Sequence, residues 1–432
     1  MFNNLFHGLS ANTSPNNSFG NKGSAIHYHL VFMLIFIVIG WEAKGQIQHQ
    51  STDITYIEPN DETGSSLATV VRDVPLAFTD QIFPLDESGN LIGSTDIDEQ
   101  VIQVFKNMER MLESAGTDLG NLLRLNIYLQ HENHSKQVLE KIRILLPEGS
   151  FPAITLINAG QPREKVLLTM DAVATAPSTS VGDGVVSLLL TEGLFGKSNR
   201  SGVALLPPGR KVFISGQAEP GENLLEASDK TMQNLFATLA YIGASAKDVV
   251  QIKAFINPIE DAAEVEEVIA AFFRGQKVPP IVMVEWLQEQ SKAEIELIAS
   301  APESQKEKES VSYYAPPWMS QATTFSRVVD VKKGGLFFTS GLYAEEGDDE
   351  ESRARNLFRT LTRVLQKAGS DYDHLVKATY YPSHEKGREG LVNVRTEYYN
   401  PVKPPAASLI RIQGTGRKGV YLNVDMIGVV PD

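Results

Sequence analysis

The sequence predicts an α/β (α+β) chain made of three tandem copies of one unit, which pack together as an intramolecular pseudo-trimer. The first observation is a helix that stops at a glycine and is followed by an alternating strand, repeated at Gly116, Gly243 and Gly369. The second is their near-constant interval of about 126 residues, the size of a duplicated domain rather than of a solenoid repeat. The third is that two helices per unit can cover only one face of its sheet.

Each copy opens with a strand and turn, and a helix follows. The opening stretches read "LAFTDQIFP", "KVFISGQAEP" and "LFFTSGLYA". The helix has apolar residues three and four apart, which places them on one helix face. They are Val101, Val104, Phe105, Met108 and Leu112; Met232, Leu235 and Leu239; and Ala354, Leu357, Phe358, Leu361 and Leu365. The glycine then supplies a left-handed C-terminal position.

The second half of each copy begins with a strand, "LLRLNIYL", "VVQIKAFI" or "LVKATYYP". A second helix follows, then a strand opened by proline, then a closing strand. The unit therefore reads strand, strand, helix, strand, helix, strand, strand. Strands such as "KVFISG" look apolar on both faces, as in a sheet covered on both sides. We expect the faces that the helices leave bare to pack against each other around an approximate threefold axis.

The predicted domains are residues 67–177, 185–301 and 317–431, with a polar linker at 46–66 and a charged linker at 302–316. Residues 1–45 differ from the rest. Their unbroken apolar run, Leu30 to Ile39, is too short to span a bilayer comfortably. The small-x-small pattern Ala43-Lys44-Gly45 favours a signal peptide that is cut near Gly45. We expect a secreted or periplasmic protein with no stable membrane span in its mature chain; the alternative is an uncleaved N-terminal anchor.

Composition excludes several kinds of site. The net charge of −14 argues against nucleic acid as a partner. The absence of cysteine excludes disulfides and thiol nucleophiles. His131 and His134 lack a third ligand nearby, so we expect no metal and no cofactor. The stretch "GTGRKG" at 414–419 precedes a strand, which indicates a hairpin loop rather than a dinucleotide site.

These segments resemble the RidA/YjgF family, also described as endoribonuclease L-PSP. In the second copy "KVFISGQAEP" is similar to the family's strand and SGQ turn, and "GASAKDVVQIKAFI" to its G-A-S-x-x-D-V-V-K signature. "VPP" and "AEIELIA" are similar to its P-A-R and closing strands. The third copy keeps "TSG", "VNVRTEYY" and "PPAAS", with "MSQA" in place of Y-S-Q-A. The first copy, with "FTDQ", is the most diverged.

The resemblance implies chorismate-mutase-like units that assemble as trimers, with small-molecule sites in clefts between units. It implies an activity, hydrolysis of enamine and imine intermediates to 2-keto acids and ammonia. An arginine binds the substrate carboxylate, and a glutamate orients water or carries protons. On this basis Ser215, Gly216 and Gln217 form the turn beside the ligand, and Asn393 matches a helix asparagine that helps to fix the site.

The arginine is absent from all three copies. Its positions are Ile154, Ile281 and Ala407, none of which can bind a carboxylate. The glutamate is predicted at Glu296, with Asp171 and Asp425 in the other copies. Arg411 and Arg163 are possible replacements for the arginine, although a solvated surface is the favoured interpretation for both.

We therefore expect a protein that binds a small metabolite in inter-repeat clefts, as a monomer and without the usual deaminase activity. The alternative is an enamine or imine deaminase with a site rebuilt around Glu296. Ribonuclease activity is opposed by the charge.

Overall fold

The computed structural model describes residues 54–182, 184–191, 199–288, 290–302 and 309–431. The predicted signal peptide, residues 1–45, lies outside them. We call the parts within 54–182, 199–302 and 309–431 repeats 1, 2 and 3. Within the described residues, none of the helices has the length and apolar character needed to cross a bilayer.

Each repeat contains the seven elements predicted, in the predicted order. Repeat 1 has β2 (Ser65–Val71), β3 (Leu76–Thr79), α2 (Ile97–Ser114), β4 (Leu122–Leu129), α3 (Ser135–Leu145), β5 (Ala153–Asn158) and β6 (Leu168–Thr175). Repeat 2 has β8 (Val203–Leu206), β9 (Lys211–Gln217), α4 (Leu224–Tyr241), β10 (Val249–Ile256), α5 (Ala262–Ala271), β11 (Ile281–Glu285) and β12 (Ala293–Ser300). Repeat 3 has β14 (Val328–Val331), β15 (Gly335–Thr339), α6 (Glu350–Ala368), β17 (Leu375–Pro382), α7 (Glu385–Arg395), β18 (Ala406–Leu409) and β19 (Leu422–Val430).

Four short strands lie outside this pattern. They are β1 (Thr55–Asn60), β7 (Ser187–Leu189), β13 (Val311–Tyr314) and β16 (Leu342–Tyr343). Two of them fall in segments that the sequence predicts as linkers: β1 in 46–66, paired with β2, and β13 in 302–316, paired with β14. Both linkers therefore contain strand residues that extend a sheet.

The first helix of each repeat has a defined start and stop. An Asp or Asn side chain accepts hydrogen bonds from backbone N–H groups of the first turn, which satisfies otherwise unpaired donors. These N-cap residues are Asp96, Asn223 and Asp349. After each helix the three predicted glycines have φ of +73°, +79° and +73°. This left-handed conformation favours glycine, so the predicted helix stops are confirmed.

The repeats exchange their first strands in a ring. In each repeat the first strand does not pair with the second strand of its own repeat. It pairs antiparallel with the second strand of another repeat. β8 of repeat 2 pairs with β3 of repeat 1, β14 of repeat 3 with β9 of repeat 2, and β2 of repeat 1 with β15 of repeat 3. Corresponding partners are Val203↔Thr79, Val328↔Ile214 and Ala68↔Thr339. Every repeat thus completes the sheet of another.

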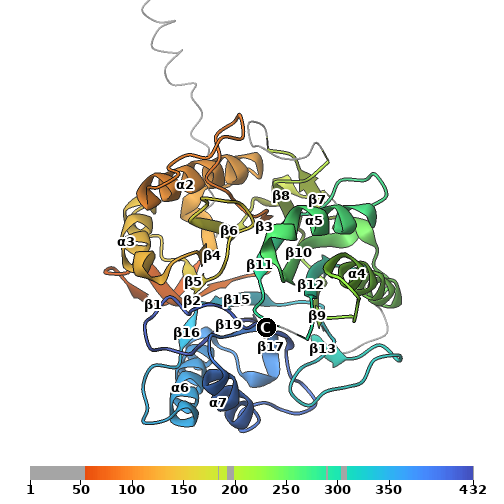
Figure 1. The fold of residues 1–432 in the computed structure, drawn as a ribbon. Helices are drawn as coiled ribbons and strands as arrows, with labels where there is room; N and C mark the ends of the chain where they lie inside the picture. Colours follow the sequence, from red (N-terminus) through yellow and green to blue (C-terminus); the bar gives the residue numbers. More distant parts are fainter. Residues whose placement is uncertain (1–53, 183, 192–198, 289, 303–308, 432) are drawn as a thin grey trace, which may run out of the picture. The chain divides into compact units, whose positions relative to one another are not determined.

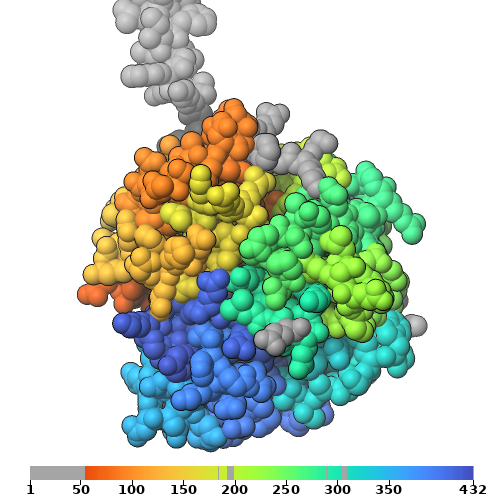
Figure 2. Space-filling model, viewed as in Figure 1, coloured from red at the N-terminus to blue at the C-terminus, as the bar shows by residue number. Residues whose placement is uncertain are grey.

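The helices lie outside and the sheets face a common centre (Figure 1). Three apolar cores separate each helix pair from its own sheet. A fourth core lies at the centre and takes residues from all three repeats, among them the equivalent Phe78, Phe213 and Phe338. The sheet faces that the helices leave bare are therefore buried against the other repeats, as the sequence predicts. On the surface the three repeats form adjoining blocks of colour (Figure 2).

Candidate functional site

Three equivalent junctions join the repeats. We call them the 1/2, 2/3 and 3/1 junctions, after the repeats that meet there. At each, a side chain at the turn next to the second strand of one repeat accepts a hydrogen bond from the backbone N–H at the position of the missing arginine in another repeat. Asp80 accepts from Ile281 (2.8 Å), Ser215 from Ala407 (3.0 Å) and Ser340 from Ile154 (2.7 Å). Ile154, Ile281 and Ala407 thus lie at the junctions, but they contribute backbone groups there.

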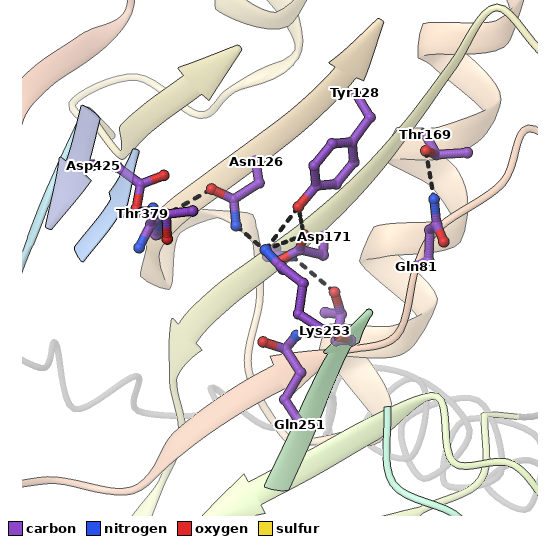
Figure 3. Close-up of polar contacts among 12 residues, drawn as sticks. Gln81, Asn126, Tyr128, Thr169, Asp171, Gln251, Lys253, Thr379 and Asp425 are labelled. Atoms are coloured by element: carbon purple, nitrogen blue, oxygen red, sulfur yellow. Dashed lines mark hydrogen bonds and ion pairs between the residues drawn. The ribbon is translucent and has the colours of Figure 1, made fainter. Parts of the chain in front are cut away.

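The predicted carboxylates Asp171, Glu296 and Asp425 form a buried polar layer around the centre, part of which Figure 3 shows. Each is paired with a cation of another repeat. Lys253 Nζ lies 3.4 Å from Asp171, Lys377 Nζ lies 2.7 Å from Glu296, and Arg124 forms an ion pair with Asp425. The ion pairs link repeat 1 to repeat 2, repeat 2 to repeat 3 and repeat 3 to repeat 1. They therefore connect the same repeats that the exchanged strands connect.

Further hydrogen bonds hold these carboxylates. Asp171 accepts from Asn126 Nδ2 (2.8 Å) and from Tyr128 Oη (2.6 Å), and Glu296 accepts from Ser408 Oγ (2.6 Å). Burial, together with Asp171, raises the pKa of the Tyr128 hydroxyl well above its usual range, so Tyr128 is a donor at neutral pH. Glu296 is only 3% exposed, so its observed contacts are those of an interior ion pair.

Glu294, two residues before Glu296, lies closer to the predicted turn. A Cβ added to Gly216 would collide with the carboxyl group of Glu294 and would lie 2.5 Å from Ser408 Oγ. Gly216 and Glu294 both keep part of their surface accessible. The structure therefore brings together Ser215, Gly216 and Ala407 of the predicted set with Glu294, which the sequence analysis did not select.

Burial raises the pKa of Glu294 to about 8. The neighbouring charge of Glu296 also raises this pKa, whereas Ser408, Lys377 and Arg327 lower it. At neutral pH this side chain carries its proton and can donate a hydrogen bond to a ligand oxygen. It can act as a proton donor there, while it becomes a base only in more alkaline solution.

This shift predicts how stability depends on pH. The folded pKa of Glu294, about 8, exceeds the ordinary value of 4.5, so the folded chain holds one more proton between these values. Stability from this group is complete below about pH 4.5 and is lost as the pH rises to about 8. We expect the melting temperature of the wild-type chain to fall relative to that of Glu294→Gln over this interval. Parallel melting curves at pH 5 and pH 8 check it, and an unchanged difference would contradict it.

At the other two junctions an amide side chain forms hydrogen bonds from one repeat to the next, and we call such a junction closed. At the 1/2 junction Gln81 donates to Thr169 Oγ1 (2.8 Å) and Met283 O (3.1 Å) and accepts from Met283 N (2.9 Å). At the 3/1 junction Asn423 Nδ2 donates to Leu156 O (3.1 Å). The strand register makes Thr169 and Asn423 the counterparts of Glu294. Only the 2/3 junction therefore has a carboxyl group at this position.

Other predicted residues lie elsewhere. Asn393 is exposed on α7, where it donates to Glu351 Oε1 (2.9 Å). Gln217 is buried, and its Nε2 donates to Thr238 Oγ1 (3.4 Å). Arg411 and Arg163 are exposed, and the Arg163 guanidinium lies over the ring of Phe83. The structure does not bring these side chains to Glu294, and their roles in binding stay predictions.

Sequence reasoning missed the three interior cations. The sequence analysis searched for a cation near these carboxylates only at and around the arginine position. Arg124, Lys253 and Lys377 are each the single charged residue of a largely apolar central strand. A single charge inside an apolar strand is itself a signal, because a buried charge requires a partner.

Two cavities in the described part of the chain lie away from Glu294. One, of about 700 Å³, lies beside α4 and α5 and is lined by Phe236 and Phe272. The other, of about 490 Å³, lies between repeats 1 and 3 and is lined by His131 and Gln413. No group of three or more metal-ligating side chains occurs in the part of the chain that the structure describes.

The fold and the junctions define a chain of three α/β repeats whose candidate small-molecule sites lie where two repeats meet. The model of the family described as endoribonuclease L-PSP matches residues 68–176, 202–301 and 318–430. The chain therefore belongs to this family, the RidA/YjgF family, with three repeats.

Known relatives are similar to single repeats. A RutC family protein of Pyrococcus abyssi is 31% identical over 91 residues, which cover 21% of this chain and 71% of the relative. Among solved structures, a YjgF family member from Neisseria meningitidis is 20% identical with a TM-score of 0.22, covering 28% of this chain and 96% of that one. The Rid family protein YyfB of Yersinia pestis is 25% identical with a TM-score of 0.26, covering 28% and 98%.

Proposed function

We propose that this protein binds one small metabolite per chain, at the 2/3 junction, and does not carry out the deamination expected of its family. The observation that carries the proposal is the asymmetry of the three junctions. Amide side chains form hydrogen bonds across the 1/2 and 3/1 junctions, while at the 2/3 junction Gly216 and Glu294 keep part of their surface accessible beside the buried Ser215.

Two features oppose hydrolysis at neutral pH. The arginine position at this junction is Ala407, which offers the junction only its backbone groups. The raised pKa of Glu294, about 8, leaves it protonated at pH 7, so it cannot take a proton from water there. Binding needs neither a base nor an ionised carboxylate, because a protonated carboxyl can donate a hydrogen bond to a ligand oxygen.

The alternative function is hydrolysis of an enamine or imine. The position of Glu294 favours it, since a carboxyl group beside the turn would become a base above about pH 8. Glu296, the predicted catalytic residue, is held by Lys377 and Ser408 in the interior. We therefore assign the carboxylate of this alternative to Glu294.

One experiment separates the two functions. Purified protein is incubated with freshly generated 2-aminoacrylate-type imines at pH 7 and pH 9, and ammonia release is followed. The binding function predicts a rate equal to that of buffer at both values. Acceleration that grows with pH and disappears in Glu294→Gln would establish the hydrolase and overturn the binding function.

We also propose that the chain is a monomer, because its three repeats already cover each other's sheet faces and exchange their strands. The sequence pattern before Gly45 supports export of the protein. Light scattering on the purified chain should give the mass of one chain, and a stable trimer of chains would contradict this.

A further inference from the structure

Arg327 lies directly beside the turn of the 2/3 junction. It precedes β14, the strand that repeat 3 contributes to the sheet of repeat 2, and its carbonyl accepts a hydrogen bond from Ser215 N (3.0 Å). The equivalent carbonyls at the other junctions belong to Gly202, which accepts from Asp80 N (2.8 Å), and Leu67, which accepts from Ser340 N (2.9 Å). A cation therefore occurs at this position in one junction of the three.

The side chain of Arg327 is half-buried and contacts two neighbours. Its Nε donates to Ser320 O (3.4 Å), and its guanidinium carbon lies 4.9 Å from the centre of the Phe325 ring. Burial lowers the pKa of Arg327, while the nearby carboxyl groups of Glu219 and Glu294 oppose this shift. Arginine stays charged at physiological pH in spite of such shifts, so a partly desolvated cation lies near Glu219 and Glu294.

The ionic state of Arg327 distinguishes it from the cations of the interior. Arg124, Lys253 and Lys377 are each paired with a carboxylate. Within the part of the chain that the structure describes, Arg327 forms no ion pair. Of its two neighbouring carboxyl groups, Glu219 accepts a hydrogen bond from Asn234 Nδ2 (2.6 Å), and Glu294 is protonated at neutral pH. A guanidinium offers several donors in one plane, which match a carboxylate.

Resting on the proposed function, we propose that Arg327 is the anion-binding group of the 2/3 junction and that the ligand is a small monocarboxylate. The carboxylate of the ligand lies against the Arg327 guanidinium, and the rest of the ligand faces the Ser215–Gly216 turn and Glu294. The cation thus reaches the ligand from the strand that repeat 3 exchanges into repeat 2, in place of the vacant position at Ala407.

The test is calorimetric titration of the purified full chain at pH 7 with pyruvate, and with pyruvamide as its uncharged counterpart. We expect pyruvate to bind at one site per chain and to lose at least about tenfold in affinity in Arg327→Gln, because the ligand carboxylate loses its charge-assisted hydrogen bonds. Pyruvamide binds wild type and Arg327→Gln alike. Arg327→Lys keeps the positive charge but lacks the planar guanidinium donors, so it should bind pyruvate with an intermediate affinity.

The matched control is Arg417→Gln, which removes an exposed cation that also lies over an aromatic ring, that of Tyr343, and beside a glutamate, Glu345. It should leave pyruvate affinity unchanged, and melting curves should show that every variant folds. Equal pyruvate affinity in wild type and Arg327→Gln, or no pyruvate binding by wild type, overturns this inference alone. Pyruvate binding that survives closure of the 2/3 junction by Gly216→Ala overturns the proposed function.

Discussion

Asp425→Ala should lower the free energy of unfolding by about 3–5 kcal/mol, because it leaves the charge of Arg124 buried without its partner. The Arg124 and Asp425 side chains are only 7% and 2% exposed, so water cannot replace the lost carboxylate. Burial disfavours the Arg124 cation, and Asp425 is the main group that offsets this and keeps the pKa of Arg124 raised. Urea unfolding of variant and wild type measures the difference.

Two control variants make this result specific to the buried pair. Glu345→Ala breaks the exposed ion pair between Glu345 and Arg417, whose side chains are 42% and 49% exposed, respectively. It should change the free energy of unfolding by less than about 1 kcal/mol. The double variant Arg124→Met/Asp425→Leu removes both charges and should recover much of the loss. Equal effects of Asp425→Ala and Glu345→Ala would show that the interior pair is not structural.

Gly216→Ala should reduce pyruvate affinity at least about tenfold, which corresponds to roughly 1.4 kcal/mol. Its added methyl group would occupy the position of the Glu294 carboxyl group and crowd Ser408 Oγ, 2.5 Å away. The carboxyl group must then move away from the turn, and the proposed ligand contacts are lost. The same calorimetric titration measures the effect.

The matched control is Gly341→Ala at the equivalent turn of the 3/1 junction. There the added Cβ would lie 2.6 Å from Asn423 Oδ1, so the local strain is comparable. Because we place no ligand at that junction, pyruvate affinity should be unchanged. A loss of equal size in both variants would indicate a general effect on folding, and no loss in Gly216→Ala would exclude the 2/3 junction.

The repeat architecture was predictable because local patterns specify it. The apolar positions of helices such as α6 recur at three and four, and Gly369 marks the helix end with φ of +73°. Strands apolar on both faces, such as "KVFISG", indicated that a second layer covers the sheet. Each of these signals acts over a short stretch of chain, so one sequence suffices to read it.

The strand exchange and the choice of junction were not predictable from such patterns. β8 could pair with β9, its neighbour along the chain, or with β3, and its four apolar residues, all of them buried, do not distinguish the two partners. Whether Glu294 or Glu296 lies at the candidate site depends on how β12 meets Ser408 and Lys377. These two residues lie more than eighty positions further along the chain. Arg327 matched no motif, because its position beside Ser215 exists only after the exchange.

The exchanged strands also fix the order in which the molecule can be completed. β2, near the start of the described chain, pairs antiparallel with β1 along one edge and with β15, which begins at Gly335, along the other. During synthesis the edge of β2 that β15 covers therefore stays without that partner until repeats 1 and 2 and the start of repeat 3 have emerged. Long-range pairing of this kind makes folding slow and leaves strand edges open to wrong partners meanwhile. Once the ring has closed, a single cut in the backbone between repeats would leave both fragments bound through their shared sheets.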